Sequence, residues 1–333
     1  MINKAFIKDI SVYLPPTILK NKDFEQMNSK WTSDKIYSKI GVKSRHVVTD
    51  DETSLSISLQ ACKNLIEKNS DIVDNIDYIL YTTLNYEHFM LVSSAIIQSR
   101  LNLSKQCCAI DLKLSCTGYL QALSIAKSLI ISNQASNVLL VTADTYSKII
   151  APEDIGTRSV FGDAATATLI SNKGEAEIMK FSFGTDGKGS ENHIARTHCL
   201  SEAFPDKHLK DLDSGRIFNK ENFYMVGGEI FEFVAKEIPS FYNTILETNQ
   251  LLPQDIRLNI FHQANSYMLS YLRKKIDIPE DKFYIDMMHV GNTSTSSIPI
   301  ALNNILRKDE YKGNILLCSF GGGYTWGGNV IKL

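Results

Sequence analysis

The sequence lacks the features that mark several large classes of protein. It has no apolar run near the ~20 residues of a membrane-spanning helix, and no apolar signal-peptide core follows Met1. Its 35 basic and 37 acidic residues nearly cancel, so no bulk attraction to nucleic acid or to an anionic membrane is expected. The six cysteines show no zinc-type pairing. We therefore expect a cytoplasmic protein in a reducing compartment, with no membrane span, no nucleic-acid partner and no metal.

Strand-like and helix-like segments alternate along the 333 residues, which predicts an α/β fold with a mostly parallel sheet. Strands are predicted at 77–84, 108–112, 137–142, 176–183 and 258–261, with a closing hairpin of 314–320 and 325–333. Helices are predicted at 91–101, 116–132, 225–246, 265–275 and 294–306. The order of elements restarts near residue 172, which indicates two similar halves, 1–172 and 173–333. Residues 184–220 are expected to form a long surface excursion.

Cys116 lies at the junction between a strand-like segment and a helix. The segment is KLSCTG at 113–118, preceded by the apolar run 108–112, which is expected to be a buried strand. A thiol at a helix N-terminus feels the positive end of the macrodipole, which lowers its pKa and favours a nucleophile. The alternative is a small buried thiol that only fills space in the core. From this segment alone both interpretations stay open.

Two segments of the second half carry further polar groups. His262 follows a strand in FHQAN at 261–265, and Asn292 lies in the polar turn GNTSTSSIP at 291–299. Strand ends in α/β proteins meet at one sheet edge, so Cys116, His262 and Asn292 can converge there. The alternatives are a hydrogen-bonding core histidine and a helix cap or turn asparagine. The glycine run 321–323 alone indicates only a turn.

Taken together, these motifs resemble one known family. KLSCTG, FHQAN, GNTSTSSIP and FGGGYTWG at 320–327 occur in the order and spacing of β-ketoacyl-acyl-carrier-protein synthase III, a thiolase-fold condensing enzyme. The shorter segments IGVKSRH at 40–46, FGDA at 161–164 and MVGGEIF at 225–231 agree. The similarity covers essentially the whole chain. It implies a thiolase-like fold whose two βα halves form a layered αβαβα core.

The resemblance also implies roles for the motif residues. Cys116 would accept the acyl group, while His262 and Asn292 would donate hydrogen bonds to the enolate oxygen formed when a malonyl thioester loses carbon dioxide. The backbone N–H groups of Cys116 and Gly322 would form a second oxyanion hole during acyl transfer. Phe320 would pack beside the departing carboxylate. Asn292 is neutral and cannot act as a base, which favours decarboxylative condensation.

Several positions depart from the family pattern where coenzyme A is held. The family's Trp and Arg fall at Lys35 and Lys39, with Trp31 out of register, and another Arg falls at Ile155, with Arg158 close by. The phenylalanine that a partner subunit supplies to the acyl pocket falls near Met90. Altered coenzyme A contacts, combined with the intact motifs of Cys116, His262 and Asn292, predict an accessory synthase that loads an acyl group other than acetyl.

The helix after His262 is expected to contact the carrier protein or coenzyme A. Asn265, Lys274 and Lys275 match the family, but Tyr267 replaces an arginine. The two lysines can attract an acidic carrier protein, or they can be an ordinary solvated helix end. We expect acyl carrier protein and acyl-CoA as partners or substrates, no cofactor, and a homodimer formed across the strand 108–112.

Two other functions remain open. The enzyme can be an acyltransferase that moves the acyl group from Cys116 to an oxygen or nitrogen nucleophile without decarboxylation. The chain can instead be a non-catalytic partner subunit, although such a subunit has no need of Cys116, His262 and Asn292 together.

Overall fold

The structure is a computed structural model that describes residues 3–88, 91–195, 210–212, 216–218, 223–306 and 308–333. Its centre is a ten-stranded sheet in the order β14-β13-β15-β16-β8-β1-β7-β6-β4-β5. The first half of the sheet contains β1 (Phe6–Tyr13), β4 (Tyr78–Thr82), β5 (Cys108–Leu112), β6 (Asn137–Asp144) and β7 (Ala164–Ser171). The second half contains β8 (Ala176–Thr185), β13 (Ile256–Phe261), β14 (Phe283–Tyr284), β15 (Asn314–Gly321) and β16 (Thr325–Lys332).

The two halves of the sheet have the same topology. Counted outwards from the middle, each contains its first, fifth, fourth, second and third strand in chain order. The two inner pairings of each half are antiparallel and the two outer pairings are parallel. The sheet is therefore mixed, and the prediction of a mostly parallel sheet was wrong. The error arose because the alternation of elements in the sequence did not reveal the antiparallel pairings among the central strands β16, β8, β1 and β7. The exact division at residue 172 remains a prediction.

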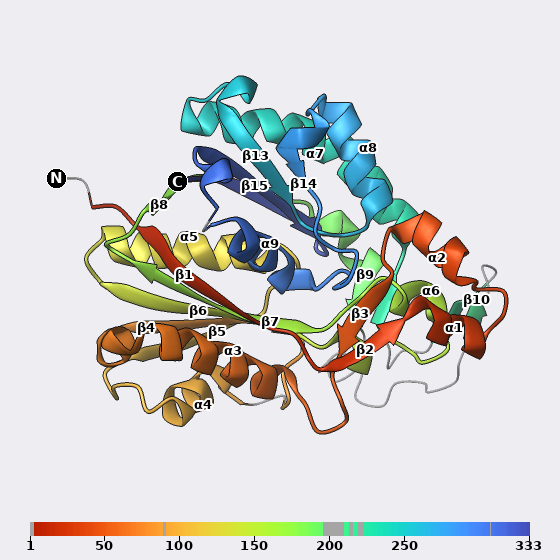
Figure 1. The fold of residues 1–333 in the computed structure, drawn as a ribbon, viewed down its shortest axis with the longest axis horizontal. Helices are drawn as coiled ribbons and strands as arrows, with labels where there is room; N and C mark the ends of the chain where they lie inside the picture. Colours follow the sequence, from red (N-terminus) through yellow and green to blue (C-terminus); the bar gives the residue numbers. More distant parts are fainter. Residues whose placement is uncertain (1–2, 89–90, 196–209, 213–215, 219–222, 307) are drawn as a thin grey trace.

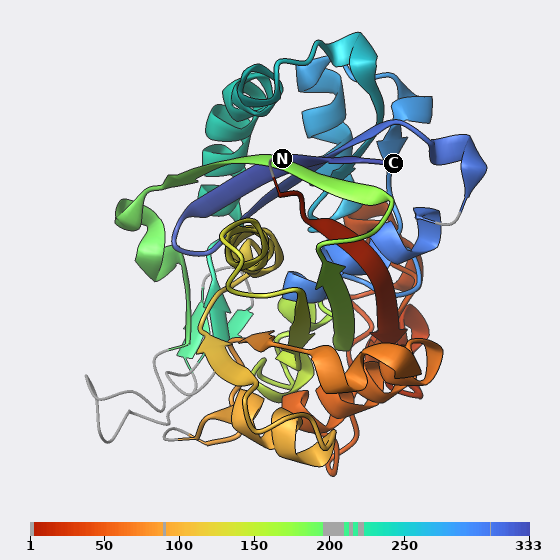
Figure 2. The same cartoon turned by 90° about the vertical axis from the view of Figure 1, so that its left-hand side faces the viewer.

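Helices form three layers around the two halves of the sheet (Figure 1). The layer against the outer face of the first half contains α3 (Ser54–Lys68) and α4 (Ser93–Arg100). The central layer contains α5 (Gly118–Ile131) and α9 (Ser297–Ile305), which lie between the two halves; Figure 2 shows α5 nearly end-on there. The third layer contains α7 (Gly227–Asn249) and α8 (Ser266–Ile276). This arrangement is the αβαβα layering that the resemblance implied.

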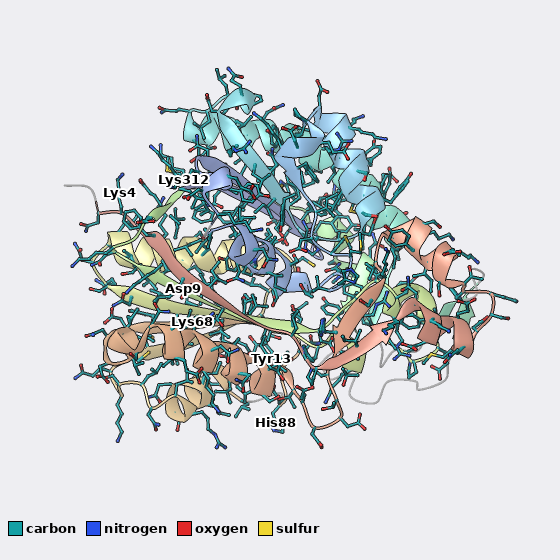
Figure 3. The ribbon with its side chains drawn as sticks, viewed as in Figure 1. Lys4, Asp9, Tyr13, Lys68, His88 and Lys312 are labelled. Atoms are coloured by element: carbon teal, nitrogen blue, oxygen red, sulfur yellow. The ribbon has the colours of Figure 1, made fainter. Side chains whose placement is uncertain are left out.

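The hydrophobic core follows these layers. The central helices are apolar on most sides, and both pack into one buried cluster with strands from both halves, including Leu120, Leu123, Ile298 and Leu302. The outer layers are amphipathic and cover one face each. Side chains also tie α3 to the sheet: Figure 3 shows Asp9 of β1 near Lys68, where Asn69 Nδ2 donates to Asp9 Oδ2 at 2.8 Å.

A smaller unit beside the sheet carries the remaining elements. It contains α1 (Asn21–Met27), α2 (Ser33–Ile40), α6 (Ile155–Arg158) and the paired strands β2 (Thr17–Lys20) and β3 (Ser44–Val47). Two further ribbons pair β9 (His193–Ala195) with β12 (Phe223–Met225) and β10 (Lys210–Leu212) with β11 (Arg216–Phe218). Sequence periodicity missed α1, α2 and α3.

Strand β5 is not the buried strand that its apolar sequence predicted. It pairs only with β4 and forms one edge of the sheet, so Cys108 is exposed and the other residues are partly exposed. Among the cysteines of the described residues, Cys62 and Cys318 are fully buried and none forms a disulfide. Cys199 lies outside the described residues. None of the described helices is long and apolar enough to span a membrane.

Candidate active site

Strand β15 fixes Cys116 and His262 relative to each other. The backbone N–H of His262 donates to Cys318 O at 2.8 Å, and the Ser319 hydroxyl donates to Cys116 O at 2.7 Å. Cys318 and Ser319 are neighbours on one strand, so His262, directly after β13, and Cys116, two residues before α5, are held at adjacent positions. The predicted convergence of these two strand ends is therefore seen in the structure.

The glycine run after Phe320 allows backbone to approach the thiol. A Cβ atom at Gly321 would lie 2.8 Å from Cys116 Cβ and 3.2 Å from Cys116 Sγ, so a side chain there would displace the Cys116 thiol. A Cβ atom at Gly322 would lie 2.4 Å from His193 Nδ1. The Ser115 hydroxyl also donates to Gly322 O at 3.2 Å. The role of the Gly322 N–H as an oxyanion donor remains a prediction.

The Cys116 thiol is buried, with 5% of the residue exposed. Its Sγ lies 3.7 Å from Ser294 Oγ. Burial raises the pKa of Cys116 to about 12; the Ser294 hydroxyl opposes this shift, and the nearby Asp144 adds to it. The prediction of a lowered pKa was wrong, because loss of solvent around the buried thiol disfavours the charged thiolate.

His262 is buried and neutral. Its Nδ1 lies 2.7 Å from Ser297 Oγ, and its ring meets the Phe320 ring edge-on, with centroids 5.7 Å apart. Burial lowers the pKa of His262 to about 3, and the neighbouring His193 lowers it further. If the Ser297 hydroxyl donates to Nδ1, the other ring nitrogen carries the proton and is a hydrogen-bond donor.

Asn292 is a rigid part of the same site. Its backbone N–H donates to Val160 O at 2.9 Å, and its carbonyl accepts from Gly162 N at 3.0 Å. Its Oδ1 accepts from Ser294 N at 2.9 Å, which leaves the Nδ2 group as its donor. Since the Ser294 hydroxyl also contacts Cys116 Sγ, this turn connects Asn292 to the Cys116 thiol. Asn292 thus makes the turn contact of the simpler interpretation while it occupies the predicted site.

Sequence reasoning missed the buried carboxylate that anchors this turn. Asp144, at the end of β6, accepts from Thr295 Oγ1 at 2.7 Å and Thr295 N at 3.2 Å, and its other oxygen accepts from Leu84 N at 3.1 Å. Burial raises the pKa of Asp144, whereas these hydrogen bonds lower it. The signal was present, because an acidic residue directly after the apolar run 137–143 is a strand-end carboxylate. Tyr146, His193, Ser294 and Ser297 were also missed.

The residues predicted to bind carrier protein or coenzyme A lie on or directly next to the helices α2, α6 and α8. Lys39 is exposed in the last turn of α2, and Lys274 and Lys275 are exposed in the last turn of α8. Asn265 caps α8, because its Oδ1 accepts from Met268 N at 2.8 Å. Their binding roles remain predictions. Met90 lies outside the described residues.

Arg158 lies in the smaller unit around Phe24. Its Nη1 donates to Pro152 O at 2.9 Å, and its guanidinium lies 5.9 Å from the centre of the Phe24 ring. Trp31, which is out of register in sequence, reaches the same helix: a Cβ atom at Gly156 would lie 3.3 Å from the Trp31 ring. Lys35 Nζ lies 5.4 Å from the centre of that ring.

Within the described parts of the chain, no three His, Cys, Asp or Glu side chains are grouped so that they could hold a metal ion. The groups gathered at the candidate site are instead a thiol, a neutral imidazole and an amide, set among buried hydroxyls. Such a set can bind an acyl group covalently and stabilise an oxyanion without a strong base.

Comparison with known proteins identifies the family. The family "3-Oxoacyl-[acyl-carrier-protein (ACP)] synthase III" matches residues 110–187, and its C-terminal counterpart matches residues 246–333. The β-ketoacyl-[acyl-carrier-protein] synthase III of Streptococcus agalactiae is 35% identical over 333 residues, covering 99% of both chains. The chain belongs to the 3-oxoacyl-[acyl-carrier-protein] synthase III family.

Other members agree over their full length. The synthase III of Clostridium perfringens strain SM101 is 32% identical, with 100% of both chains covered. A crystal structure of a 3-oxoacyl-(acyl-carrier-protein) synthase III superposes with a TM-score of 0.96 at 34% identity, covering 99% of this chain and 100% of that one. The protein is therefore an enzyme of the 3-oxoacyl-[acyl-carrier-protein] synthase III kind with a thiolase fold, as the resemblance predicted.

Proposed function

We propose that the enzyme catalyses decarboxylative condensation of a Cys116-bound acyl group with a malonyl thioester. The observation that carries this proposal is the pairing of a neutral His262 with the amide of Asn292 beside the Cys116 thiol. Both side chains can donate hydrogen bonds. Neither is charged, so neither readily transfers a proton to a carbanion or removes one from it.

The reaction has two stages. First, the Cys116 sulfur attacks the carbonyl of an acyl thioester; the new sulfur–carbon bond replaces the old one, and the donor leaves as a free thiol that carries the proton. The backbone N–H groups of Cys116 and Gly322 would hold the oxyanion of this step. The close contact at Gly321 supports this assignment, because it keeps the glycine backbone against the thiol.

In the second stage the malonyl thioester breaks its bond to the carboxylate and releases carbon dioxide. The enolate left behind attacks the acyl carbonyl on Cys116, so a carbon–carbon bond forms, a β-ketoacyl thioester leaves and Cys116 takes up a proton. Hydrogen bonds from His262 and Asn292 would stabilise the enolate oxygen, and a donor of this kind contributes about 2.7–4 kcal/mol in a comparable site. Phe320, packed against His262, would line the path of the departing carboxylate.

The partners follow from the same proposal. The malonyl group would arrive on acyl carrier protein, and the acyl donor would be acyl-CoA or an acyl carrier protein. Lys39, Arg158, Asn265, Lys274 and Lys275 are the proposed contacts. The unpaired edge of β5 is the proposed site of homodimer formation.

The test is carbon dioxide release from labelled malonyl-carrier protein after loading with a panel of acyl thioesters. We expect acyl-dependent release by the wild type and a fall of about 10²–10³-fold in Asn292→Ala, with Cys116 still acylated. Asn292→Asp is the isosteric variant: it keeps the shape of the side chain but replaces the hydrogen-bond donor with an acceptor. Its carbon dioxide release should fall as far as that of Asn292→Ala. Acylation of Cys116 without any release would instead favour an acyltransferase that uses another nucleophile.

A further inference from the structure

Tyr146 lies beside the nucleophile although no motif points to it. It follows β6 by two residues, and the carboxylate of Asp144 at the end of that strand holds Thr295 at 2.7 Å. The residue before Thr295 is Ser294, whose hydroxyl is 3.7 Å from Cys116 Sγ. The same hydrogen bonds that build the catalytic turn therefore bring the Tyr146 side chain to it.

The Tyr146 ring belongs to a closed aromatic wall made of Tyr146, Phe161 and Phe223. It stacks on Phe161 with centroids 4.4 Å apart at 11°, and it meets Phe223 edge-on at 5.1 Å. All three side chains are buried. Phe161 also pairs through its backbone with Asn292. Because the rings touch one another, an acyl chain cannot pass between them, and the wall limits its length.

The phenol of Tyr146 is polar, buried and without a partner. Its hydroxyl forms no hydrogen bond within the described parts of the chain, although the Ser294 hydroxyl lies near it. A buried polar atom without a partner costs about 1–3 kcal/mol. Tyr81 and Tyr119 are also buried without hydrogen bonds, but their nearby hydroxyls belong to Ser58 and Thr168.

The charges around the phenol indicate which ligand it suits. The ionisable groups that act on Tyr146 are Cys116 and Asp144, and both are acids. On the other side of Phe223 lies His193, at 4.7 Å between ring centroids, and burial lowers its pKa to about 4, so it is neutral. These surroundings disfavour a carboxylate and favour an uncharged oxygen atom.

We propose that the Tyr146 hydroxyl forms a hydrogen bond with an oxygen atom of the acyl group on Cys116, so that the enzyme selects a short hydroxyacyl or oxoacyl thioester over a plain alkanoyl one. This inference rests on the proposed function, because it requires Cys116 to accept an acyl group. Tyr146 acts here as a specificity-determining residue.

The experiment measures kcat/KM for acylation of Cys116 by intact mass. The probes are four-carbon thioesters: butyryl, 2-hydroxybutyryl, 3-hydroxybutyryl and acetoacetyl, each presented on coenzyme A and on carrier protein. The wild type should prefer at least one oxygen-bearing probe over butyryl by about tenfold, the value of one hydrogen bond. Tyr146→Phe should lose that preference, so that its kcat/KM with the oxygen-bearing probes falls to the value that the same variant shows with butyryl.

Tyr119→Phe is the matched control, since it removes another buried phenol with no partner from α5 and should keep the wild-type preference. Equal rates for all four probes in the wild type would overturn the inference and leave the proposed function intact. A preference that persists in Tyr146→Phe would do the same. If no probe acylates Cys116 although another acyl thioester does, the inference fails and the proposed function stands; if no acyl thioester acylates Cys116, both fail.

Discussion

The two halves of the molecule place different chemistry at equivalent points of one topology. In the first half, Cys116 lies between the third strand, β5, and the central helix α5. In the second half, Asn292 lies between the third strand, β14, and the central helix α9. A thiol and an amide thus occupy matching positions. The scaffold provides the location, and the side chain at that location decides between covalent chemistry and hydrogen-bond donation.

Burial shifts the pKa of a titratable group in each half, and the consequence for its proposed role differs. Burial raises the pKa of Cys116 to about 12 and lowers that of His262 to about 3, so both groups are held in their neutral forms. For the histidine this is the state that the proposed donor needs. For the cysteine it means that reaction requires loss of a proton. We therefore assign acyl loading to the first half and enolate stabilisation to the second.

The largest effect should come from removing the thiol of the first half. Cys116→Ala should reduce self-acylation at least about 10³-fold, because it removes the thiol that the proposed site uses to form the thioester. Carbon dioxide release from malonyl-carrier protein without an acyl group should persist, because His262 and Asn292 remain. Intact-mass and label-release assays measure the two activities. Cys62→Ala, at a buried cysteine of α3, should change neither; loss of both activities in Cys116→Ala would contradict the division of roles.

A change of pH should affect the reactivity of Cys116 in the first half and leave the protonation state of His262 in the second half unchanged. Since the pKa of His262 is lowered to about 3, it stays neutral above pH 5, and carbon dioxide release should show no inflection near pH 6.5. Since the pKa of Cys116 is raised to about 12, its thiolate fraction should rise about tenfold per pH unit, or about 100-fold from pH 7 to pH 9. Iodoacetamide alkylation, followed by peptide mass, measures this rise. A plateau below pH 9 would contradict the neutral thiol, and the exposed Cys108 is the internal reference.

A smaller effect should follow from removing the hydrogen-bond partner of His262 in the second half. Ser297→Ala removes the 2.7 Å partner of Nδ1, so carbon dioxide release should fall about tenfold while self-acylation stays within about twofold. Ser296→Ala is the matched control: its hydroxyl bonds to Thr142 at 2.8 Å and does not contact the histidine. Equal losses in the two variants would show a general packing effect rather than control of the histidine.

The sequence predicted those parts of the fold and the site that a local motif or a strand-like run marks, and it did not predict those that depend on distant contacts. The strands β4, β6, β8, β13, β15 and β16 were predicted from strand-like runs in the sequence, whereas β5 was predicted as a strand but wrongly as a buried one. Cys116, His262 and Asn292 were recognised because they lie in motifs at strand ends. Asp144 and Tyr146 lie in no motif, and their roles depend on Thr295 and Ser294, about 150 residues later. Contacts of this range follow only from the assembled sheet.

The same limit explains the wrong predictions. The pKa of Cys116 was predicted from the adjacent helix, but it depends on burial beneath Gly321 and the Ser294 turn, both distant in sequence. The mostly parallel sheet was predicted from alternation of elements, but the strands at the centre of the sheet, β16, β8, β1 and β7, pair antiparallel with one another. Local pattern gives the type of an element, and tertiary pairing gives its direction and exposure.

The smallest effect concerns which half the carrier protein approaches. Reversing two exposed charges on α8 of the second half, with Lys274→Glu and Lys275→Glu, should raise KM for malonyl-carrier protein about threefold to tenfold at low salt and leave kcat unchanged. The matched control reverses two exposed lysines of α3 on the first half, with Lys63→Glu and Lys68→Glu, which gives the same change in net charge. Because salt screens exposed charges within about 8 Å at physiological ionic strength, the effect should vanish near 0.5 M salt. Equal changes in KM for both pairs would mean that net charge, rather than a docking site on the second half, attracts the carrier protein.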